Sequence, residues 1–299
     1  MQSEEGTSAF RLYSLILLMV SLWAANFIFG KIVLREMPPL LVMGWRMVLA
    51  GLMMVPVYLL HVRKTRRPGF SWQELPLLLA LGLLGVGLNQ LLFVNGLSRT
   101  SVAHAAIMIG LQPMSVIVLT AITGQERMNA VRALGMALAL GGVAVLQFGG
   151  AAASKGVATP LGDLLVFLAG FTFACFTVAG KATMGRVGGV VVNAVAYVGT
   201  AVVLLPTTVW YSQGFDYGAI TWQAWASLFY MALCPSVIAY LIFYWALARI
   251  PASRLSAFSY LQPLLATLLA IPFLGEFPNM SLALGGALVL AGVFVAERL

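Results

Sequence analysis

Charged residues are scarce in this chain: Asp, Glu, Lys and Arg make up 9% of its 299 residues, whereas 61% are hydrophobic. Because soluble proteins average about 25% charged residues, this composition excludes an ordinary soluble domain and predicts a membrane protein. The formal net charge of +8 does not indicate a nucleic-acid partner. The basic residues lie at the ends of apolar runs, where charges border a bilayer.

The residue groups that carry common enzyme chemistry are also missing. The chain has two histidines and two cysteines, and it shows no metal-ligand spacing, Gly-rich phosphate loop or nucleophile triad. Cys175 and Cys234 lie inside apolar runs, where packing is a better interpretation than a disulfide. We therefore expect no enzyme activity, no metal and no cofactor.

Acidic residues are absent from the middle of the apolar runs; the nearest, Glu126, Asp163 and Glu276, are near run ends. Proton-driven exchangers generally need a titratable relay inside the membrane, so this absence favours transport without proton coupling; the alternative is coupling by a route that the sequence does not reveal. No deep pair of basic residues is evident either, which argues against a phosphorylated substrate. We expect Lys31 and Arg46 to extend to lipid headgroups near the outer surface.

Long apolar runs dominate the rest of the sequence. A helix needs about 20 apolar residues to cross a bilayer core, and unpaired backbone groups cannot face lipid. The runs are too long and too uniform for barrel strands, so the prediction is an all-α integral membrane protein. Its ten predicted transmembrane helices are residues 11–31, 39–60, 75–97, 101–121, 131–148, 161–181, 188–210, 223–247, 254–273 and 280–297.

Lysines and arginines are distributed unevenly between alternate loops. Twelve of the 17 lie near the termini or after even-numbered predicted helices, which by the positive-inside rule predicts cytoplasmic N- and C-termini. The first apolar stretch runs on to Leu34, too far for a cleaved signal peptide. The connections are short, so no inserted soluble domain is expected.

The tripeptide Leu-Gln-Pro occurs twice, at residues 111–113 and 261–263. At the same offset of 150, "ALGMALALGGVAV" (133–145) matches "ALGGALVLAGVFV" (283–295). Apolar composition alone would not place a Gln-Pro pair in both halves at the same offset that aligns the other matching residues. An internal duplication is therefore predicted.

The offset divides the chain into two repeats, residues 1–149 and 150–299, each with five predicted helices. Because five is odd, the second repeat enters the membrane from the opposite side, which makes the repeats inverted. Secondary transporters are commonly built this way, with the substrate site near the midplane where the halves meet.

Pro113 and Pro263 are predicted hinges. Neither can donate a backbone hydrogen bond to the previous turn, and the freed carbonyls of Ile109 and Ser259 need a neighbouring helix or a wet cavity as partner. The alternative is a kink that serves packing only. Gln112 and Gln262 could likewise be interhelical hydrogen-bonding groups.

Amides and aromatic residues at membrane depth suggest a cavity suited to a neutral or zwitterionic substrate with an apolar body. For each single residue, ordinary packing remains an alternative. The candidate substrate-binding residues are Trp23, Asn26, Asn89, Gln90, Gln112, Tyr240, Tyr244, Ser259, Tyr260 and Gln262.

Two pairs of opposite charges are predicted gates. The inverted arrangement places Arg99 and Glu276 at the outer surface, and Arg249 and Glu126 at the inner one. The alternative interpretation is that these residues are interface charges and helix caps.

The chain resembles the drug/metabolite transporter superfamily, EamA type. The resemblance lies in "LWAANFIFGK" (22–31), "GLSRTSVAHAAIMIGLQP" (96–113) and "ALARIPASRLSAFSYLQP" (246–263) and extends over essentially the whole chain. In that family the residue before the helix-9 proline is often Glu, whereas here it is Gln262. The resemblance implies a bacterial inner-membrane metabolite exporter with a central cavity.

The aromatic-rich lining is most similar to that of aromatic amino acid exporters. This resemblance implies export of aromatic and other neutral amino acids by alternating access; efflux of drugs or nucleobases is the alternative. The expected partners are a small-molecule substrate and membrane lipid, with the chain as a monomer or weak dimer.

Overall fold

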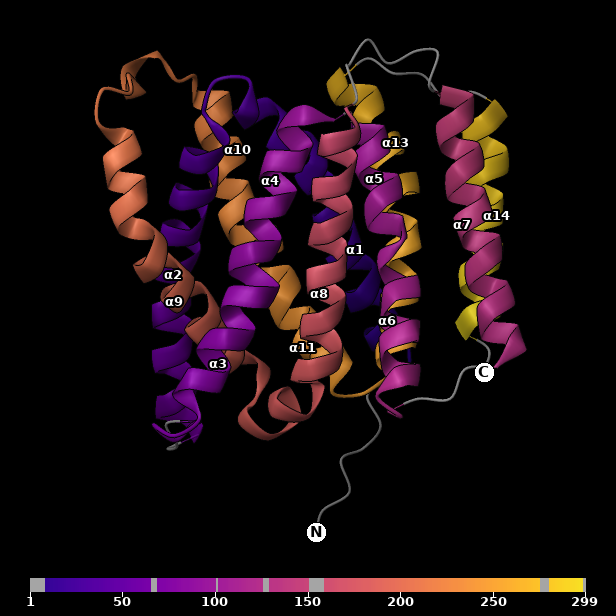
Figure 1. Ribbon diagram of the computed structural model, residues 1–299, viewed down its shortest axis with the longest axis horizontal. Coiled ribbons are helices and arrows are strands. Elements are labelled where there is room, and N and C mark those ends of the chain that lie inside the picture. Colours follow the sequence, from indigo (N-terminus) through magenta and orange to yellow (C-terminus); the bar gives the residue numbers. More distant parts are fainter. Residues whose placement is uncertain are drawn as a thin grey trace.

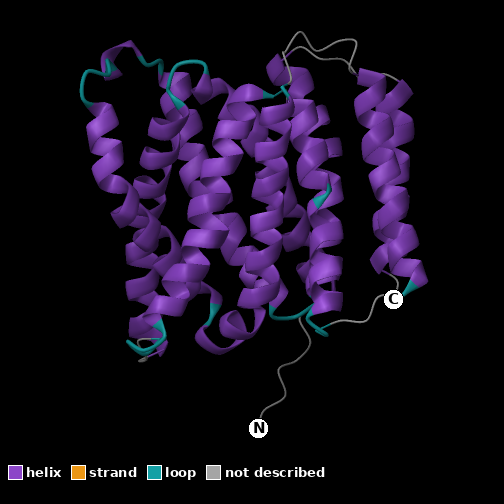
Figure 2. Ribbon diagram, viewed as in Figure 1, coloured by secondary structure: helices purple, strands orange, loops and turns teal. Residues whose placement is uncertain are grey.

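A computed structural model describes residues 9–65, 69–100, 102–125, 129–150, 159–274 and 280–297. All regular elements in these ranges are helical, and the longer helices stand side by side in one bundle (Figure 2). The apolar character of the helices and the absence of strands from the described residues agree with the predicted all-α membrane protein.

The helices of the first half follow the predicted apolar runs, with breaks inside two of them. They are α1 (Ala9–Leu34), α2 (Pro39–Thr65), α3 (Leu75–Gly82), η1 (Leu83–Leu88), α4 (Asn89–Arg99), α5 (Val102–Gly110), α6 (Gln112–Ile122) and α7 (Ala130–Gly150).

The second half repeats this order. It comprises α8 (Pro160–Val187), α9 (Gly189–Ser212), η2 (Tyr217–Ala219), α10 (Trp222–Leu233), η3 (Cys234–Ala239), α11 (Tyr240–Leu247), α12 (Ala252–Ala257), η4 (Phe258–Tyr260), α13 (Leu261–Leu274) and α14 (Met280–Glu297). The start of α1 and the end of α14 lie toward the same end of the bundle (Figure 1).

By length and composition, six helical stretches of the described residues could cross a membrane. They comprise α1, α2, the run from α3 to α4, α8, α9 and the run from α10 to α11. Of the remaining predicted crossings, α5–α6, α7 and α14 contain shorter apolar stretches, and residues 252–274 are helical through α12, η4 and α13. The total of ten crossings therefore stays a prediction.

Two long helical runs each contain a π-helical segment, η1 (Leu83–Leu88) and η3 (Cys234–Ala239). At the offset of 150, residues 84–88 correspond to 234–238, so the two segments occupy equivalent places. A π turn inside an α-helix frequently marks a functional site. Here each π segment directly precedes cavity-lining residues of the same run.

The Leu-Gln-Pro tripeptides also mark irregular points. The first separates α5 from α6, which begins at Gln112 with Pro113 in its first turn. The second follows the 3₁₀ segment η4 and opens α13. Each proline thus sits where the chain restarts as an α-helix. Its use as a hinge stays a prediction.

Reciprocal contacts join the two halves at α7 and α14, which stand beside the main body (Figure 1). A Cβ added to Gly142 would lie 2.7 Å from the carbonyl oxygen of Gly285, and one added to Gly292 would lie 2.6 Å from that of Gly135. These four residues exchange places at the offset of 150. Such exchange is what a two-fold relation between repeats requires.

Candidate functional site

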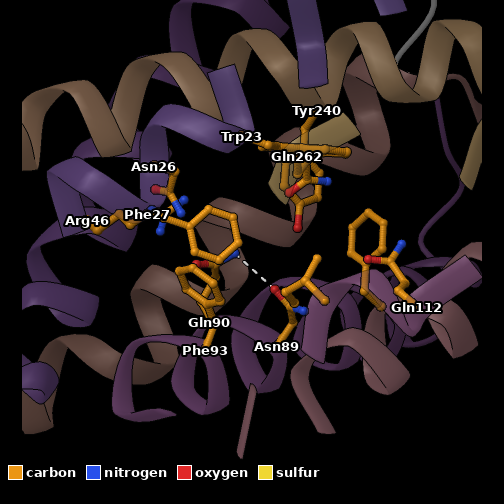
Figure 3. Close-up of a pocket in the computed structure, with 12 residues that line it drawn as sticks. Trp23, Asn26, Phe27, Arg46, Asn89, Gln90, Phe93, Gln112, Tyr240 and Gln262 are labelled. Carbon is orange, nitrogen blue, oxygen red and sulfur yellow. Dashed lines mark hydrogen bonds between the residues drawn. The ribbon is translucent and has the colours of Figure 1, made fainter. Parts of the chain in front are cut away.

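A cavity lies among α1, α2, α4, α5, α6, α8, α11 and α13 (Figure 3). Both halves of the chain contribute to its wall. The lining residues are Trp23, Asn26, Phe27, Arg46, Asn89, Gln90, Phe93, Ile109, Gln112, Phe173, Tyr240 and Gln262.

Seven of the ten candidate substrate-binding residues line this cavity. They are Trp23, Asn26, Asn89, Gln90, Gln112, Tyr240 and Gln262.

Tyr244, Ser259 and Tyr260 are not among the lining residues. Tyr244 is buried against Phe176 and Phe243, with ring centroids 6.1 and 5.7 Å away. Ser259 and Tyr260 are buried within η4. The expectation that Ser259 and Tyr260 face the cavity assumed a regular α-helix through residues 254–273. The tighter 3₁₀ turn rotates the side chains to a different face.

An aromatic cluster forms one wall of the cavity. The rings of Phe173, Tyr240 and Phe243 each lie 5.8 Å from the ring of Trp23. Edge-to-face contacts at such distances stabilise aromatic pairs beyond simple burial. The Trp23 indole is further fixed because its Nε1 donates a hydrogen bond to the Pro235 carbonyl, 3.2 Å away. The cluster therefore offers a rigid apolar surface.

Amide groups supply the polar part of the lining. Asn89 Nδ2 donates to the Ala169 carbonyl at 2.7 Å, and Gln90 Nε2 donates to Asn89 Oδ1 at 3.0 Å (Figure 3). These bonds leave Gln90 Oε1 without a partner, and the buried Asn26 Oδ1 has none either. The wall thus presents hydrogen-bond acceptors that are shielded from solvent.

Arg46 is the residue that the sequence analysis placed wrongly. Its side chain is 1% exposed and lines the cavity instead of reaching lipid headgroups. Position 46 lies seven residues into α2 (Pro39–Thr65), roughly 10 Å along the helix axis, on a face that packs against the second half of the chain. A basic residue that deep in an apolar run is itself a functional signal.

The Arg46 guanidinium has few partners. Nε donates to Ser236 Oγ at 3.0 Å, and Nη1 has no hydrogen-bond partner. No ion pair to Arg46 is found among the residues that the structure describes. The cavity lining therefore carries a positive charge that sequence reasoning had placed at the membrane surface.

Lys31 also differs from the expectation. It is half-buried, and its Nζ donates to the Thr100 carbonyl at 2.5 Å. Thr100 Oγ1 in turn bonds Asp163 Oδ1. This chain of contacts joins α1, the C-terminal end of α4 and the first turn of α8 near the end of the bundle, so Lys31 serves helix packing there.

The predicted gate pairs cannot be compared with the structure, because Glu126 and Glu276 lie outside the described residues. Arg99 bonds the Asn95 carbonyl at 2.8 Å, within its own helix. Arg249 bonds the Trp245 carbonyl at 2.8 Å and lies 4.1 Å above the Trp245 ring. Both gates stay predictions.

The EamA-like transporter family matches the chain twice, over residues 11–148 and 160–297. The chain therefore belongs to this family of membrane transporters. It is not an enzyme, and it crosses the membrane several times. The two matched stretches fall one in each predicted repeat.

Several known proteins are similar over most of this chain. An uncharacterized transporter of Archaeoglobus fulgidus is 28% identical over 284 residues, 94% of this chain and 95% of its own. A probable terminal-alkyne amino-acid exporter of Streptantibioticus cattleyicolor is 30% identical over 233 residues, 78% of this chain and 76% of its own. A crystal structure with 22% identity matches 97% of both chains at a TM-score of 0.76, which shows the shared fold.

Proposed function

We propose that this protein exports aromatic and other neutral amino acids across a bacterial inner membrane, with both termini in the cytoplasm. The observation that carries the proposal is the cavity itself. Aromatic rings such as Trp23 and Phe173 surround a space that amides and one buried arginine also reach. An amphipathic zwitterion with an apolar body matches that lining.

The similar protein of S. cattleyicolor supports an amino acid as substrate, because it is described as a probable amino-acid exporter. The deep location of the cavity, with lining residues from both halves, supports alternating access by two inverted repeats. In this mechanism the halves rock about the central site, and the chain breaks before Pro113 and Pro263 act as hinges. The Arg99–Glu276 and Arg249–Glu126 pairs would close the two ends.

Transport without proton coupling is part of the proposal. Acidic side chains do not line the cavity in the described part of the chain, and a proton relay through the membrane generally uses such groups. Flux would then follow the substrate gradient.

Reconstitution into liposomes tests the function directly. Purified protein should accelerate uptake of labelled Phe, Trp, Tyr, Met or Thr over protein-free liposomes, with saturation and with competition among these amino acids. An imposed pH gradient should leave the initial rate unchanged. Absence of flux for every one of them would contradict amino-acid export, and competition by drugs or nucleobases alone would favour the alternative substrates.

A further inference from the structure

No ion pair compensates the charge of Arg46 among the described residues. Arginine stays protonated in proteins, and moving an ion out of water is costly unless a counter-charge meets it. A neutral hydroxyl, Ser236 Oγ, is the hydrogen-bond partner found for the guanidinium in the described part of the chain, and Nη1 remains unpartnered. An anion would compensate this charge.

The unpartnered atoms of the lining form a complementary set. Arg46 Nη1 is a cationic donor, whereas Asn26 Oδ1 and Gln90 Oε1 are neutral acceptors. All three side chains are at most 7% exposed, and all three line the same cavity. A ligand that satisfies them must bring one anionic acceptor together with a polar hydrogen donor.

We propose that Arg46 binds the α-carboxylate of the substrate, while Asn26 Oδ1 and Gln90 Oε1 accept hydrogen bonds from its α-ammonium group. This assignment rests on the proposed export of amino acids and specifies how they are recognised. It makes Arg46 the residue that discriminates carboxylates from their neutral derivatives.

The position of the site fixes the orientation of the substrate. Arg46 and Asn26 lie toward one end of the group drawn in Figure 3, Gln112 lies toward the other, and the rings of Phe27 and Phe93 lie between them. With its carboxylate at Arg46, an amino acid extends its side chain along these rings toward Gln112.

A phosphate ester is a poorer match than a carboxylate. A phosphoryl group carries a charge near −2 at neutral pH, and Arg46 is the one basic residue among the lining residues. A single carboxylate balances a single guanidinium and can accept two of its N–H groups in parallel.

Ligand binding to the purified protein tests the assignment. The probes are L-phenylalanine, L-phenylalaninamide, 3-phenylpropionate and 2-phenylethylamine, which differ in carboxylate and ammonium only. The wild-type protein should bind phenylalanine and phenylpropionate at least about 30-fold more tightly than phenylalaninamide and phenylethylamine, respectively, because breaking a buried charge pair is this costly.

Arg46→Met should remove this preference for acids. Arg35→Met is the matched control, because Arg35 is exposed in the turn after α1, and it should retain the wild-type preference. Thermal unfolding without ligand separates recognition from folding: Arg46→Met should be at least as stable as the wild type, because it removes an uncompensated buried charge. A purely structural arginine would leave the variant less stable.

An unchanged acid preference in Arg46→Met would overturn the assignment. If that variant fails to fold, the wild-type series decides, and equal affinity for phenylalanine and its amide overturns it as well. Failure of the carboxylate site can be distinguished from failure of the proposed amino-acid export. Binding of phenylpropionate through Arg46 without any amino-acid flux would leave the carboxylate site standing and remove amino-acid export.

Discussion

Gly85 and Pro235 occupy equivalent positions 150 residues apart, and the backbone carbonyl of each accepts a hydrogen bond from a cavity-lining aromatic side chain. Tyr240 Oη donates to Gly85 at 3.3 Å, and Trp23 Nε1 donates to Pro235 at 3.2 Å. Both carbonyls belong to π segments. Each half of the chain is thus fastened to the π segment of the other half, directly at the cavity.

Removal of the Trp23 donor should loosen this connection while the aromatic wall stays in place. We expect Trp23→Phe to be less stable by about 1 kcal/mol and to bind amino acids several-fold more weakly, because the ring loses its fixed orientation. Thermal unfolding and concentration-dependent liposome uptake measure the two effects. Trp72→Phe is the control, because Trp72 is 82% exposed. Equal behaviour of the two variants would contradict a role for the bond.

The α7–α14 contact gives a prediction about stability. A Cβ on Gly142 would lie 2.6 Å from the Val289 amide nitrogen, and backbone atoms cannot yield as a flexible side chain does. Gly142→Ala should therefore destabilise the protein by about 1–3 kcal/mol, as overpacking generally does.

Gly141→Ala is the neighbouring control for this prediction, because a Cβ there would meet nothing within 4 Å. Alanine is also the better helix former, so this variant should be no less stable than the wild type. Thermal unfolding of both variants in detergent provides the comparison. Equal unfolding temperatures would show that the two helices are not closely packed at Gly142.

The helices and the repeated tripeptide were predictable because they are properties of a linear sequence. Apolar runs of bilayer length predict the helices, and residues 111–113 and 261–263 show the duplication without any structure. The rotation of a side chain about its helix is harder to predict where the helix is irregular. For this reason Ser259 and Tyr260, at the 3₁₀ segment η4, were expected in the cavity but lie outside it.

Arg46 shows a second limit of sequence reasoning. Its depth in α2 could be read from the sequence, but its direction depends on packing against Ser236, which lies 190 residues further along the chain. A basic residue near a helix end and one that lines a cavity look alike until the partner helices are placed. Giving more weight to the depth of Arg46 inside the apolar run would have identified this residue as a cavity candidate.

Gln112 and Gln262 provide a test of the cavity wall that is independent of Arg46. Both are equivalent in the repeat and line the cavity, so Gln112→Ala and Gln262→Ala should each raise the KM for amino-acid uptake. A lost hydrogen bond of about 0.5–1.5 kcal/mol corresponds to an increase of roughly 2- to 12-fold. Gln73→Ala and Gln223→Ala form a matched control pair, since both residues are repeat-equivalent and exposed. Unchanged uptake in the first pair would exclude contact with substrate.

Glu36 gives a prediction about pH outside the membrane-spanning helices. Its carboxylate accepts hydrogen bonds from the Thr221 amide nitrogen and Oγ1, both at 2.7 Å, which lower the pKa of Glu36 below its ordinary value. A carboxyl group whose pKa is lowered by folding stabilises the folded state above its unfolded pKa and loses this contribution as pH falls through the folded pKa. The unfolding temperature of the wild type should therefore exceed that of Glu36→Gln at about pH 7, and the difference should vanish in strong acid, below the ordinary carboxyl pKa near 4.3. Thermal unfolding of both proteins across this pH range measures the difference in unfolding temperature. A difference that stays constant with pH would show that the charge of the Glu36 carboxylate does not hold the turn after α1 against the start of α10.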